Sequence, residues 1–440
     1  MFVSKRILFF KSKENGYMLF CGNSNSFYLI EDENVPIIKN MIDTGREEGL
    51  PEDIRKEFVK SGVLLNESDE EFFNRLKFSS YLTRFSKNHL ALTIAPTMAC
   101  NFKCVYCFEG ERVQNFTMTE EVIDGLINFI KNRDCKFLNL AWYGGEPLCA
   151  WNKIVEINNR LKELNIPKIS QSIVTNGSLL DEKKIQYFID NNIRQIQITL
   201  DGKEETHNQR RPMKNGENSY QSIITALDKL YKICKEKNEK LYVSIRINVD
   251  KSNMDVFHGL YTELNSKYEN MFNIYPAFVN KDSESDCHAD ACLNSQEYST
   301  FILDLITKYK IQTHSVYPLR NMLVGCAVNC INTYVISSNG DIYRCWEDIN
   351  IQNKKIGNVI KGIDDVSNIV QSDVMEGSGF EDEKCKDCLF LYSCMGGCPK
   401  KRKENMLLKK ELNPVCSSIK TNPESYLEAY YEYKNKKMVL

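Results

Sequence analysis

The length, composition and charge of the chain already exclude several classes of protein. With 440 residues the chain exceeds one ordinary hydrophobic core, so we expect two or three domains. Its 57 Lys and Arg against 59 Asp and Glu give a net charge of −2, which argues against nucleic acid as a partner. No apolar run reaches membrane-spanning length, and Met1–Phe10 lacks a signal-peptide pattern. We therefore predict a cytoplasmic protein without a membrane partner.

Residues 1–65 have the pattern of a small separate module. Two strand-like runs are joined through Asn15-Gly16, which is a strong hairpin signal, and helical patterns follow up to Gly62. The predicted strands are Arg6–Phe10, Tyr17–Phe20 and Ser26–Ile30, and the predicted helices are Val35–Met41 and Pro51–Val59. Residues 66–89 are charged and helical in pattern, and we predict that they link this module to a second, independent core.

Strands and helices alternate from residue 90 onward. The predicted strands are Leu90–Ile94, Phe137–Trp142, Gln171–Thr175, Gln195–Leu200, Tyr242–Val249 and Phe272–Phe278. The helices between them are Glu120–Lys131, Lys153–Leu164, Glu182–Asn191, Tyr220–Lys235 and Met254–Tyr268. Such alternation predicts parallel βαβ units in an α/β protein, and six units are too few for a closed eight-fold barrel. We therefore predict an open, partial (β/α)6 barrel over residues 90–310.

Seventeen cysteines in a cytoplasmic chain indicate metal or cluster ligands, because disulfides are rare in that compartment. Cys100, Cys104 and Cys107 follow the first strand of the predicted barrel with the spacing C-x3-C-x2-C. Three thiolates can hold three irons of a [4Fe–4S] cluster and leave the fourth iron open to a small molecule. A zinc loop is the alternative for this segment taken alone.

This loop and the turns after the later strands resemble the radical S-adenosylmethionine (SAM) family. In that family the open iron chelates SAM, and electron transfer cleaves SAM to a 5′-deoxyadenosyl radical that abstracts hydrogen. The resemblance implies that Gly144, Gly145 and the backbone or side chain of Glu146 meet the amino group of SAM, with the glycines allowing a close approach. It likewise implies contacts from Thr199 to the ribose and from Arg211 to the carboxylate. The matching residues are Cys100, Cys104, Tyr106 and Cys107 in the loop, Gly144-Gly145-Glu146-Pro147 in one turn, and Thr199, Asp201-Gly202, His207 and Arg211 in another, with Asn208 in place of the usual Asp.

A second group of cysteines lies in residues 311–440, which we predict to be a separate cysteine-rich domain. Its members are Cys326, Cys330, Cys345, Cys385, Cys388, Cys394, Cys398 and Cys416. Eight thiolates suffice for two fully ligated [4Fe–4S] clusters, whereas the segment from Cys385 to Cys398 alone would also suit zinc.

The spacing of these cysteines, with Gly340 before Cys345, resembles the SPASM domain. That resemblance implies three [4Fe–4S] clusters in the whole chain. Auxiliary cluster I would take Cys326, Cys330, Cys345 and Cys398, and auxiliary cluster II would take Cys385, Cys388, Cys394 and Cys416. Only three residues separate Cys326 from Cys330, which leaves two possibilities. Either all four cysteines bind cluster I, or strain in this short loop leaves Cys326 unbound and one iron of the cluster open. Six cysteines remain, of which Cys21, Cys135, Cys149 and Cys234 are predicted core residues, and Cys287 and Cys292 are either substrate-side thiols or parts of an ordinary loop.

Residues 1–65 resemble the winged-helix-like RiPP recognition element, which binds the leader of a ribosomally made precursor peptide. Together the resemblances imply a radical SAM/SPASM peptide maturase that abstracts hydrogen and then forms a thioether or carbon–carbon cross-link. The implied partners are a precursor peptide and an external electron donor of the flavodoxin or ferredoxin type.

Two alternatives stay open. Anaerobic sulfatase-maturing enzymes, which make formylglycine, place an Asp base directly after the cysteine equivalent to Cys345. This chain has Trp346 there, with Glu347 and Asp348 beyond it. The other alternative is a non-catalytic iron–sulfur electron-transfer or zinc-binding protein, in which the open cysteine loop would have no role.

Overall fold

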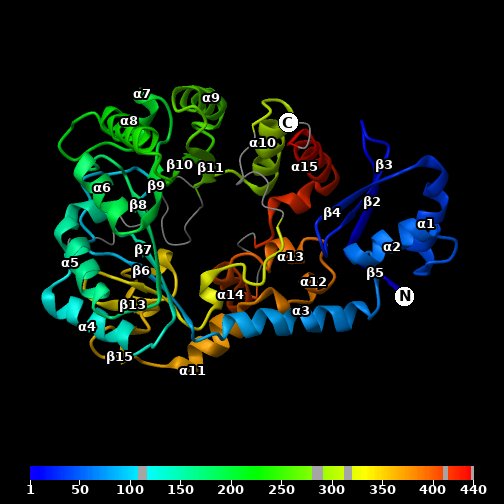
Figure 1. The fold of residues 1–440 in the computed structure, drawn as a ribbon, viewed down its shortest axis with the longest axis horizontal. Coiled ribbons are helices and arrows are strands. Elements are labelled where there is room, and N and C mark those ends of the chain that lie inside the picture. The colour runs from blue at the N-terminus through cyan, green and yellow to red at the C-terminus, as the bar shows by residue number, and fades with distance from the viewer. Residues whose placement is uncertain (108–115, 280–290, 312–319, 410–414, 438–440) are drawn as a thin grey trace.

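The chain folds as three regions that share one main hydrophobic core. The computed structural model describes residues 1–107, 116–279, 291–311, 320–409 and 415–437. A small N-terminal module lies at one end, a parallel sheet surrounded by helices lies at the other, and the C-terminal helices lie between them (Figure 1). No helix in these ranges combines the length and the apolar character that a membrane span requires.

The central sheet confirms all six strands predicted from residue 90 onward, with ends that shift by a few residues. They are β6 (His89–Ile94), β7 (Phe137–Trp142), β8 (Lys168–Thr175), β9 (Ile193–Thr199), β10 (Tyr242–Val249) and β11 (Asn273–Phe278). Each is parallel to its neighbour, in the order β11-β10-β9-β8-β7-β6. The carboxyl ends of all six strands therefore meet at one edge of the sheet.

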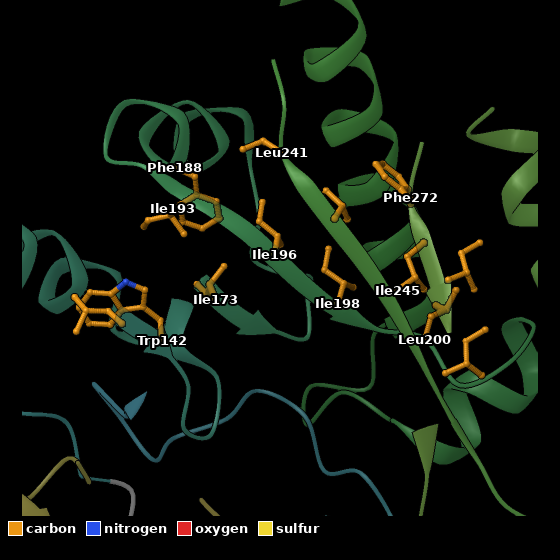
Figure 2. Close-up of a cluster of buried hydrophobic side chains, with 14 of the residues drawn as sticks. Trp142, Ile173, Phe188, Ile193, Ile196, Ile198, Leu200, Leu241, Ile245 and Phe272 are labelled. Carbon is orange, nitrogen blue, oxygen red and sulfur yellow. The ribbon is translucent and has the colours of Figure 1, made fainter. Parts of the chain in front are cut away.

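The helices that follow these strands cover one face of the sheet. The last helix of the series, α10 (Ser295–Thr307), lies beside the C-terminal helix of residues 423–437, and the helices on the sheet face are α4 (Glu120–Lys131), α5 (Trp151–Lys162), α6 (Glu182–Asp190), α7 (Glu204–Arg210), α8 (Ser219–Lys237) and α9 (Phe257–Lys267). Side chains on alternate strand positions, such as Trp142, Ile173, Ile196 and Ile245, are fully buried against them (Figure 2). The intervening positions, such as Gln197 and Tyr275, are polar and only partly buried. Because side chains alternate along a strand, the face away from the helices is the polar one.

The C-terminal region extends the same sheet. Strand β12 (Thr333–Ile336) lies parallel to β6, and antiparallel β13 (Asp341–Tyr343), β14 (Gly357–Asn358) and β15 (Gly362–Ile363) follow. Gly340 makes the turn between β12 and β13 with φ +82°, a conformation that favours glycine. The helices of this region are α11 (Val366–Ile369), a π-helical turn (Val370–Glu376), α12 (Glu383–Lys386), α13 (Leu391–Cys394), α14 (Pro399–Leu408) and α15 (Pro423–Lys437).

The N-terminal module has the predicted strands and helices, but its core is not independent. Antiparallel strands β2 (Ile7–Lys11), β3 (Tyr17–Cys21) and β4 (Ser26–Ile30) precede α1 (Val35–Thr44) and α2 (Glu52–Ser61), and β1 (Phe2–Val3) pairs with β5 (Leu64–Leu65). One face of β3 packs on α1 and α2 through Leu19 and Cys21. The other face, with Met18 and Phe20, joins the main core. The apolar run along β3 is continuous because both of its faces are buried.

Residues 66–89 contain α3 (Asp69–Arg84), which packs along the C-terminal region (Figure 1). The helix begins with a capping box formed by Ser68 and Glu71. Phe73 and Leu76 are buried against residues of the segment 380–395. Fully buried Arg84 donates to the hydroxyl of Ser378 at 2.6 Å. The segment thus does more than connect two regions, because it contributes side chains to the C-terminal core.

Candidate active site

The parallel sheet brings the sequence-predicted motifs together at the carboxyl ends of its strands. The cysteine loop follows β6, the glycine turn follows β7, and Thr199 is the last residue of β9. Thr199 is buried and lies in register with Arg246 of β10, whose Nε donates to Asn248 at 2.8 Å. This edge is where parallel α/β proteins place their active sites.

On one side, the cysteine loop is held by the glycine turn. The backbone N–H of Gly145 donates to Thr97 at 3.2 Å, and that of Glu146 donates to Ala99 at 2.9 Å. A Cβ atom on Gly145 would lie 2.4 Å from the carbonyl oxygen of Met98, and one on Gly144 would lie 2.4 Å from that of Thr97. The absence of side chains at these glycines therefore lets the turn pack closely against the cysteine loop. The sequence motif had predicted a close approach to SAM, and the contact with the loop is a second reason for glycine at these positions.

On the other side, the loop is held by residues 210–214. Lys103 donates its backbone N–H to Pro212 at 2.9 Å, and Val105 donates to Arg210 at 3.0 Å. In the reverse direction Lys214 donates to Asn101 at 2.9 Å. Phe102 is buried in the middle of this contact. Main-chain hydrogen bonds on both sides thus fix the position of the loop.

The three thiols of this loop form a donor set that suits an iron–sulfur cluster. Burial raises the pKa of Cys100 to about 12, and the charges of nearby Glu146, Cys104 and Cys107 add to the increase. Burial also raises the pKa of Cys104, against the opposing charge of Arg211. Iron would displace these protons, because thiolates are the form that binds metal. Three clustered thiols on a clamped loop fit a [4Fe–4S] cluster with one iron open.

Tyr106, before the third cysteine, is the centre of a buried polar network. Its hydroxyl oxygen accepts from Arg211 Nη1 at 2.7 Å and from Asn248 Nδ2 at 2.9 Å, and its O–H donates to Asp201. The guanidinium of Arg210 lies 5.2 Å from the centre of the ring. Arg211, the predicted partner of the SAM carboxylate, is therefore positioned by Tyr106, while its Nε has no partner among the described side chains.

Asp201 is a site residue that the sequence analysis quoted but gave no role. It is fully buried, and it accepts from the backbone N–H of Asn248 at 3.2 Å as well as from Tyr106. Burial raises the pKa of Asp201, while Arg211 opposes that shift. Its backbone N–H donates to Nδ1 of His207 at 3.1 Å, so the neutral imidazole carries its proton on Nε2. The available signal was an acidic residue directly after a buried strand.

Glu146 uses its carboxylate within the protein. One oxygen accepts from Leu148 N–H at 3.0 Å and from Thr175 Oγ1 at 2.7 Å, and the other accepts from Asn176 N–H at 2.7 Å. Burial raises the pKa of this carboxyl despite the three donors. The side chain therefore ties the glycine turn to the end of β8, which favours the turn's backbone over the carboxylate as the contact for SAM.

Four C-terminal cysteines surround one cavity. It is lined by Cys385, Cys388, Cys394 and Cys416, together with Phe390, Leu391, Arg402 and Lys420. Arg402 Nη2 lies 3.6 Å from the sulfur of Cys385, and Lys420 Nζ lies 3.9 Å from that of Cys416. These are the four cysteines that the SPASM resemblance implied for auxiliary cluster II, and they suit a fully ligated cluster.

The other four C-terminal cysteines lie before β12, after β13 and before α14. Burial raises the pKa of Cys326, and the charge of Cys398 adds to the increase, so these two thiols are neighbours despite their separation in sequence. Burial likewise raises the pKa of Cys330, which lies near Arg84, Arg344 and Cys326. Within the described chain, no three His, Cys, Asp or Glu side chains lie close enough together to hold a single metal ion, whereas a [4Fe–4S] cluster needs only one thiolate at each iron.

The remaining cysteines are divided between core and surface. Cys21, Cys135 and Cys234 are buried as predicted, whereas Cys149 is exposed, because it lies in the short turn that follows Glu146. Cys292 is partly buried, and Cys287 lies outside the described residues.

The turn after Cys345 reaches back toward the carboxyl edge of the sheet. Trp346, which is 49% exposed, stacks on Tyr143 of the glycine turn with ring centres 6.0 Å apart. Ile349 packs with Ala95 and Met98 at the base of the cysteine loop. This C-terminal turn is therefore part of the same site as the cysteine loop.

Comparisons with known proteins agree with this geometry. Residues 94–252 match the family described as the Radical SAM superfamily. A cysteine-type anaerobic sulfatase-maturating enzyme of Clostridium perfringens is 25% identical over 364 residues, which cover 75% of this chain and 94% of that enzyme. The radical SAM cyclopropyl synthase TigE of Paramaledivibacter caminithermalis is 25% identical over 288 residues, covering 58% of this chain and 57% of TigE.

Two solved structures share the fold over most of the chain. Native anSMEcpe with bound AdoMet superposes with a TM-score of 0.61 at 20% identity, covering 79% of this chain and 98% of that one. SuiB of Streptococcus suis bound to S-adenosylmethionine has a TM-score of 0.52 at 17% identity, covering 95% of this chain and 99% of that one.

The fold and the clamped cysteine loop define a SAM-dependent enzyme of the radical type. Residues 94–252 form a radical SAM domain, which makes the chain an enzyme of radical redox chemistry and implies S-adenosylmethionine and a [4Fe–4S] cluster as its cofactors.

Proposed function

We propose that this enzyme matures a ribosomally synthesised precursor peptide by forming a thioether or, as the second choice, a carbon–carbon cross-link. The SAM and iron–sulfur chemistry supplies a 5′-deoxyadenosyl radical, which removes hydrogen from a carbon of the peptide. In the thioether case a substrate Cys contributes the sulfur. The cross-linked product is two electrons more oxidised than the precursor. One hydrogen atom passes from carbon to the 5′-deoxyadenosyl radical, and the second hydrogen leaves as a proton and an electron, which an auxiliary cluster would accept.

The observation that carries this proposal is the environment of Trp346. Sulfatase-maturing enzymes, as the sequence resemblance has it, use an Asp base at this position, and an indole cannot accept the substrate proton. The carboxylates of the next two residues, Glu347 and Asp348, are both close to a lysine and are therefore not free to act as that base. Lys400 Nζ lies 3.5 Å from the carboxylate of Glu347 and 3.0 Å from that of Asp348. Trp346 and Tyr143 instead offer an aromatic wall against which a peptide side chain can pack.

The protein's own groups would hold SAM and exclude competing reactions. Backbone groups of Gly144 and Gly145 would meet its amino group, Thr199 its ribose and Arg211 its carboxylate. Tyr106 and Asp201 would keep Arg211 in place, since the guanidinium already bonds the Tyr106 hydroxyl.

The N-terminal module supports a peptide substrate with a leader. In the sheet β2-β3-β4 the edge strand β4 pairs with β3, and its Leu29 is 50% exposed. We propose that a leader adds a strand along β4, with main-chain hydrogen bonds giving affinity and side-chain pockets giving specificity. SuiB, whose solved structures include one bound to the precursor peptide SuiA, shares the fold over 95% of this chain.

Two auxiliary [4Fe–4S] clusters complete the proposal. The cavity of Cys385, Cys388, Cys394 and Cys416 would hold one, and Cys326, Cys330, Cys345 and Cys398 would hold the other. An external donor of the flavodoxin or ferredoxin type would supply electrons.

Formylglycine formation is the second candidate function. The similarity to a sulfatase-maturating enzyme over 94% of that enzyme's length favours it. About a quarter of this chain lies outside that similarity, which covers 75% of it.

Mass spectrometry of a co-expressed short precursor, chosen from the neighbouring genes, tests the proposal. We expect a product lighter by two hydrogen atoms, with fragmentation suppressed between the joined residues and no aldehyde that reacts with a hydrazide. A hydrazide-reactive product from a sulfatase-derived peptide, together with an unmodified precursor, would favour formylglycine formation instead.

A further inference from the structure

The loop that connects the ligands of the proposed auxiliary cluster II lies directly against the N-terminal module. This loop, residues 385–394, contains three of the four cysteines around the cavity. It is contacted by residues of the module that precede it by more than 360 positions.

Gly22 makes the closest approach. It is buried at the end of β3, and a Cβ atom added to it would lie 1.9 Å from the carbonyl oxygen of Leu389. Leu389 directly follows the ligand Cys388. Real Cβ atoms do not approach a backbone oxygen so closely, so even alanine at this position requires the ligand loop to move.

Arg6 holds the same loop through a buried guanidinium. Its Nη2 donates to the carbonyl of Lys386, which lies between Cys385 and Cys388. Its Nη1 lies 3.4 Å from Asp69 at the start of α3. The side chain is fully buried and lies over the ring of Phe72 at 5.6 Å. A planar group with several donors can reach both partners at once, which a lysine cannot do.

Two further contacts extend the interface. Ser393, next to Cys394, donates its hydroxyl to Asn25 Oδ1 at 3.0 Å. Phe390 lines the cavity and also packs on Phe20 of β3, with ring centres 6.3 Å apart. A single side chain, Phe390, therefore lies between the cavity and the N-terminal module at this point.

We propose that the N-terminal module is part of the protein shell of auxiliary cluster II, so that the loading and reduction potential of this cluster depend on the module. The proposal rests on the assignment of these cysteines to a cluster in the proposed function. Arg6, Gly22 and Asn25 are positioning residues, because they act on the cluster through the backbone of its ligand loop. A peptide bound at the module would thereby also reach the electron-transfer centre.

The test uses two full-length variants, each of which adds one methyl group at a different glycine. Gly22→Ala adds it against the ligand loop, whereas Gly259→Ala, in α9, adds it where no heavy atom lies within 4 Å. Arg6→Lys is a milder variant that keeps the charge. Each protein is reconstituted anaerobically, and iron per chain, the EPR spectrum after reduction and the midpoint potentials of the clusters are measured.

We expect Gly259→Ala to keep the wild-type count of about twelve irons, and Gly22→Ala to retain about eight with a native circular dichroism spectrum. Arg6→Lys should keep its iron but change the EPR signal and the midpoint potential of one cluster. If Gly22→Ala does not fold, the test rests on Arg6→Lys. Wild-type EPR spectra and midpoint potentials in Arg6→Lys would then overturn the proposal. Full iron and unchanged potentials in folded Gly22→Ala would overturn it as well. About four irons per chain in the wild-type protein would instead show that the auxiliary clusters are absent, which would contradict the proposed function itself.

Discussion

The two cysteine loops of this enzyme are supported in different ways. The loop of residues 100–107 is held by its own domain, through main-chain hydrogen bonds to the glycine turn and to residues 210–214. The loop of residues 385–394 is held by the N-terminal module and α3, through Arg6, Gly22 and Phe73. The first loop takes its hydrogen bonds from its own domain, with Ile349 of the C-terminal region packed at its base, whereas the second loop joins three segments that are distant in sequence. The loop proposed to bind the reactive cluster is thus shaped mainly by its own domain, while the proposed auxiliary site is open to influence from the N-terminal module.

The largest effect should follow from replacing the three cysteines of the loop of residues 100–107. Replacing Cys100, Cys104 and Cys107 by Ala should abolish cleavage of SAM to 5′-deoxyadenosine, because no other described cysteine lies on this loop. About eight of about twelve irons should remain, since the C-terminal cysteines are untouched. Chromatography of the nucleoside product and an iron assay measure both outcomes. Continued formation of 5′-deoxyadenosine would contradict the assignment of the reactive cluster.

A single methyl group should also break this loop. In Gly145→Ala the new Cβ would lie 2.4 Å from the carbonyl oxygen of Met98 and 2.5 Å from that of Ala99, so the cysteine loop must move. We expect SAM cleavage to fall by at least about tenfold, which corresponds to about 1.4 kcal/mol. Gly259→Ala is the matched control and should retain wild-type turnover.

The outcome would separate the two loops. If Gly145→Ala loses SAM cleavage while its auxiliary EPR signals persist, the first loop is supported independently of the second. Equal turnover in Gly145→Ala and Gly259→Ala would show that the glycine turn does not set the position of the cysteine loop.

A smaller effect should come from the network under the reactive site. Tyr106→Phe removes the oxygen that accepts from Arg211 and Asn248, leaving buried donors without a partner at a cost of about 1–3 kcal/mol. We expect a lower melting temperature and a higher Kd for SAM, since Arg211 loses its support. Tyr242→Phe, at a position 66% exposed on β10, is the control. Calorimetric titration with SAM that gives the wild-type Kd for Tyr106→Phe would argue against this role.

The last effect leaves the chemistry of the site untouched and concerns only the pH dependence of stability. Burial lowers the pKa of His207 to about 2, with Arg211 and Arg210 adding to the decrease, so the folded protein keeps this side chain neutral. In the unfolded chain the group binds a proton below its ordinary pKa of about 6.5, so its contribution to stability is lost as the pH falls below that value.

His207→Gln tests this sign, because an amide oxygen can accept the same backbone N–H without titrating. Between about pH 7 and pH 5 the wild type should lose about 2 kcal/mol more stability than the variant. Chemical denaturation at the two pH values measures the difference. An identical loss in both proteins would mean that His207 does not contribute to the acid sensitivity of the barrel.

Much of the barrel could be predicted because its signals are local. The alternation of apolar runs located all six parallel strands, and the C-x3-C-x2-C spacing identified the loop that the sheet places at its carboxyl edge. The roles of Asp201 and Glu146 could not be read in the same way. Asp201 bonds Tyr106, 95 residues earlier, and Glu146 bonds Thr175 and Asn176 on the next strand. Those partners depend on which strands are neighbours, which a spacing pattern does not contain.

The sequence by itself indicated the class of chemistry, because the three candidate ligands of the reactive cluster lie on one short loop and their spacing is visible in the sequence. It also determined the order of strands and helices, since the periods of 2 and 3.6 residues follow from local backbone geometry. The tertiary structure alone decided that the module shares the main core and contacts a loop of cysteine ligands. Arg6 and Lys386 are separated by 380 residues, and no local rule relates them. Their contact arises because the second apolar face of β3 requires cover, and the C-terminal region supplies it.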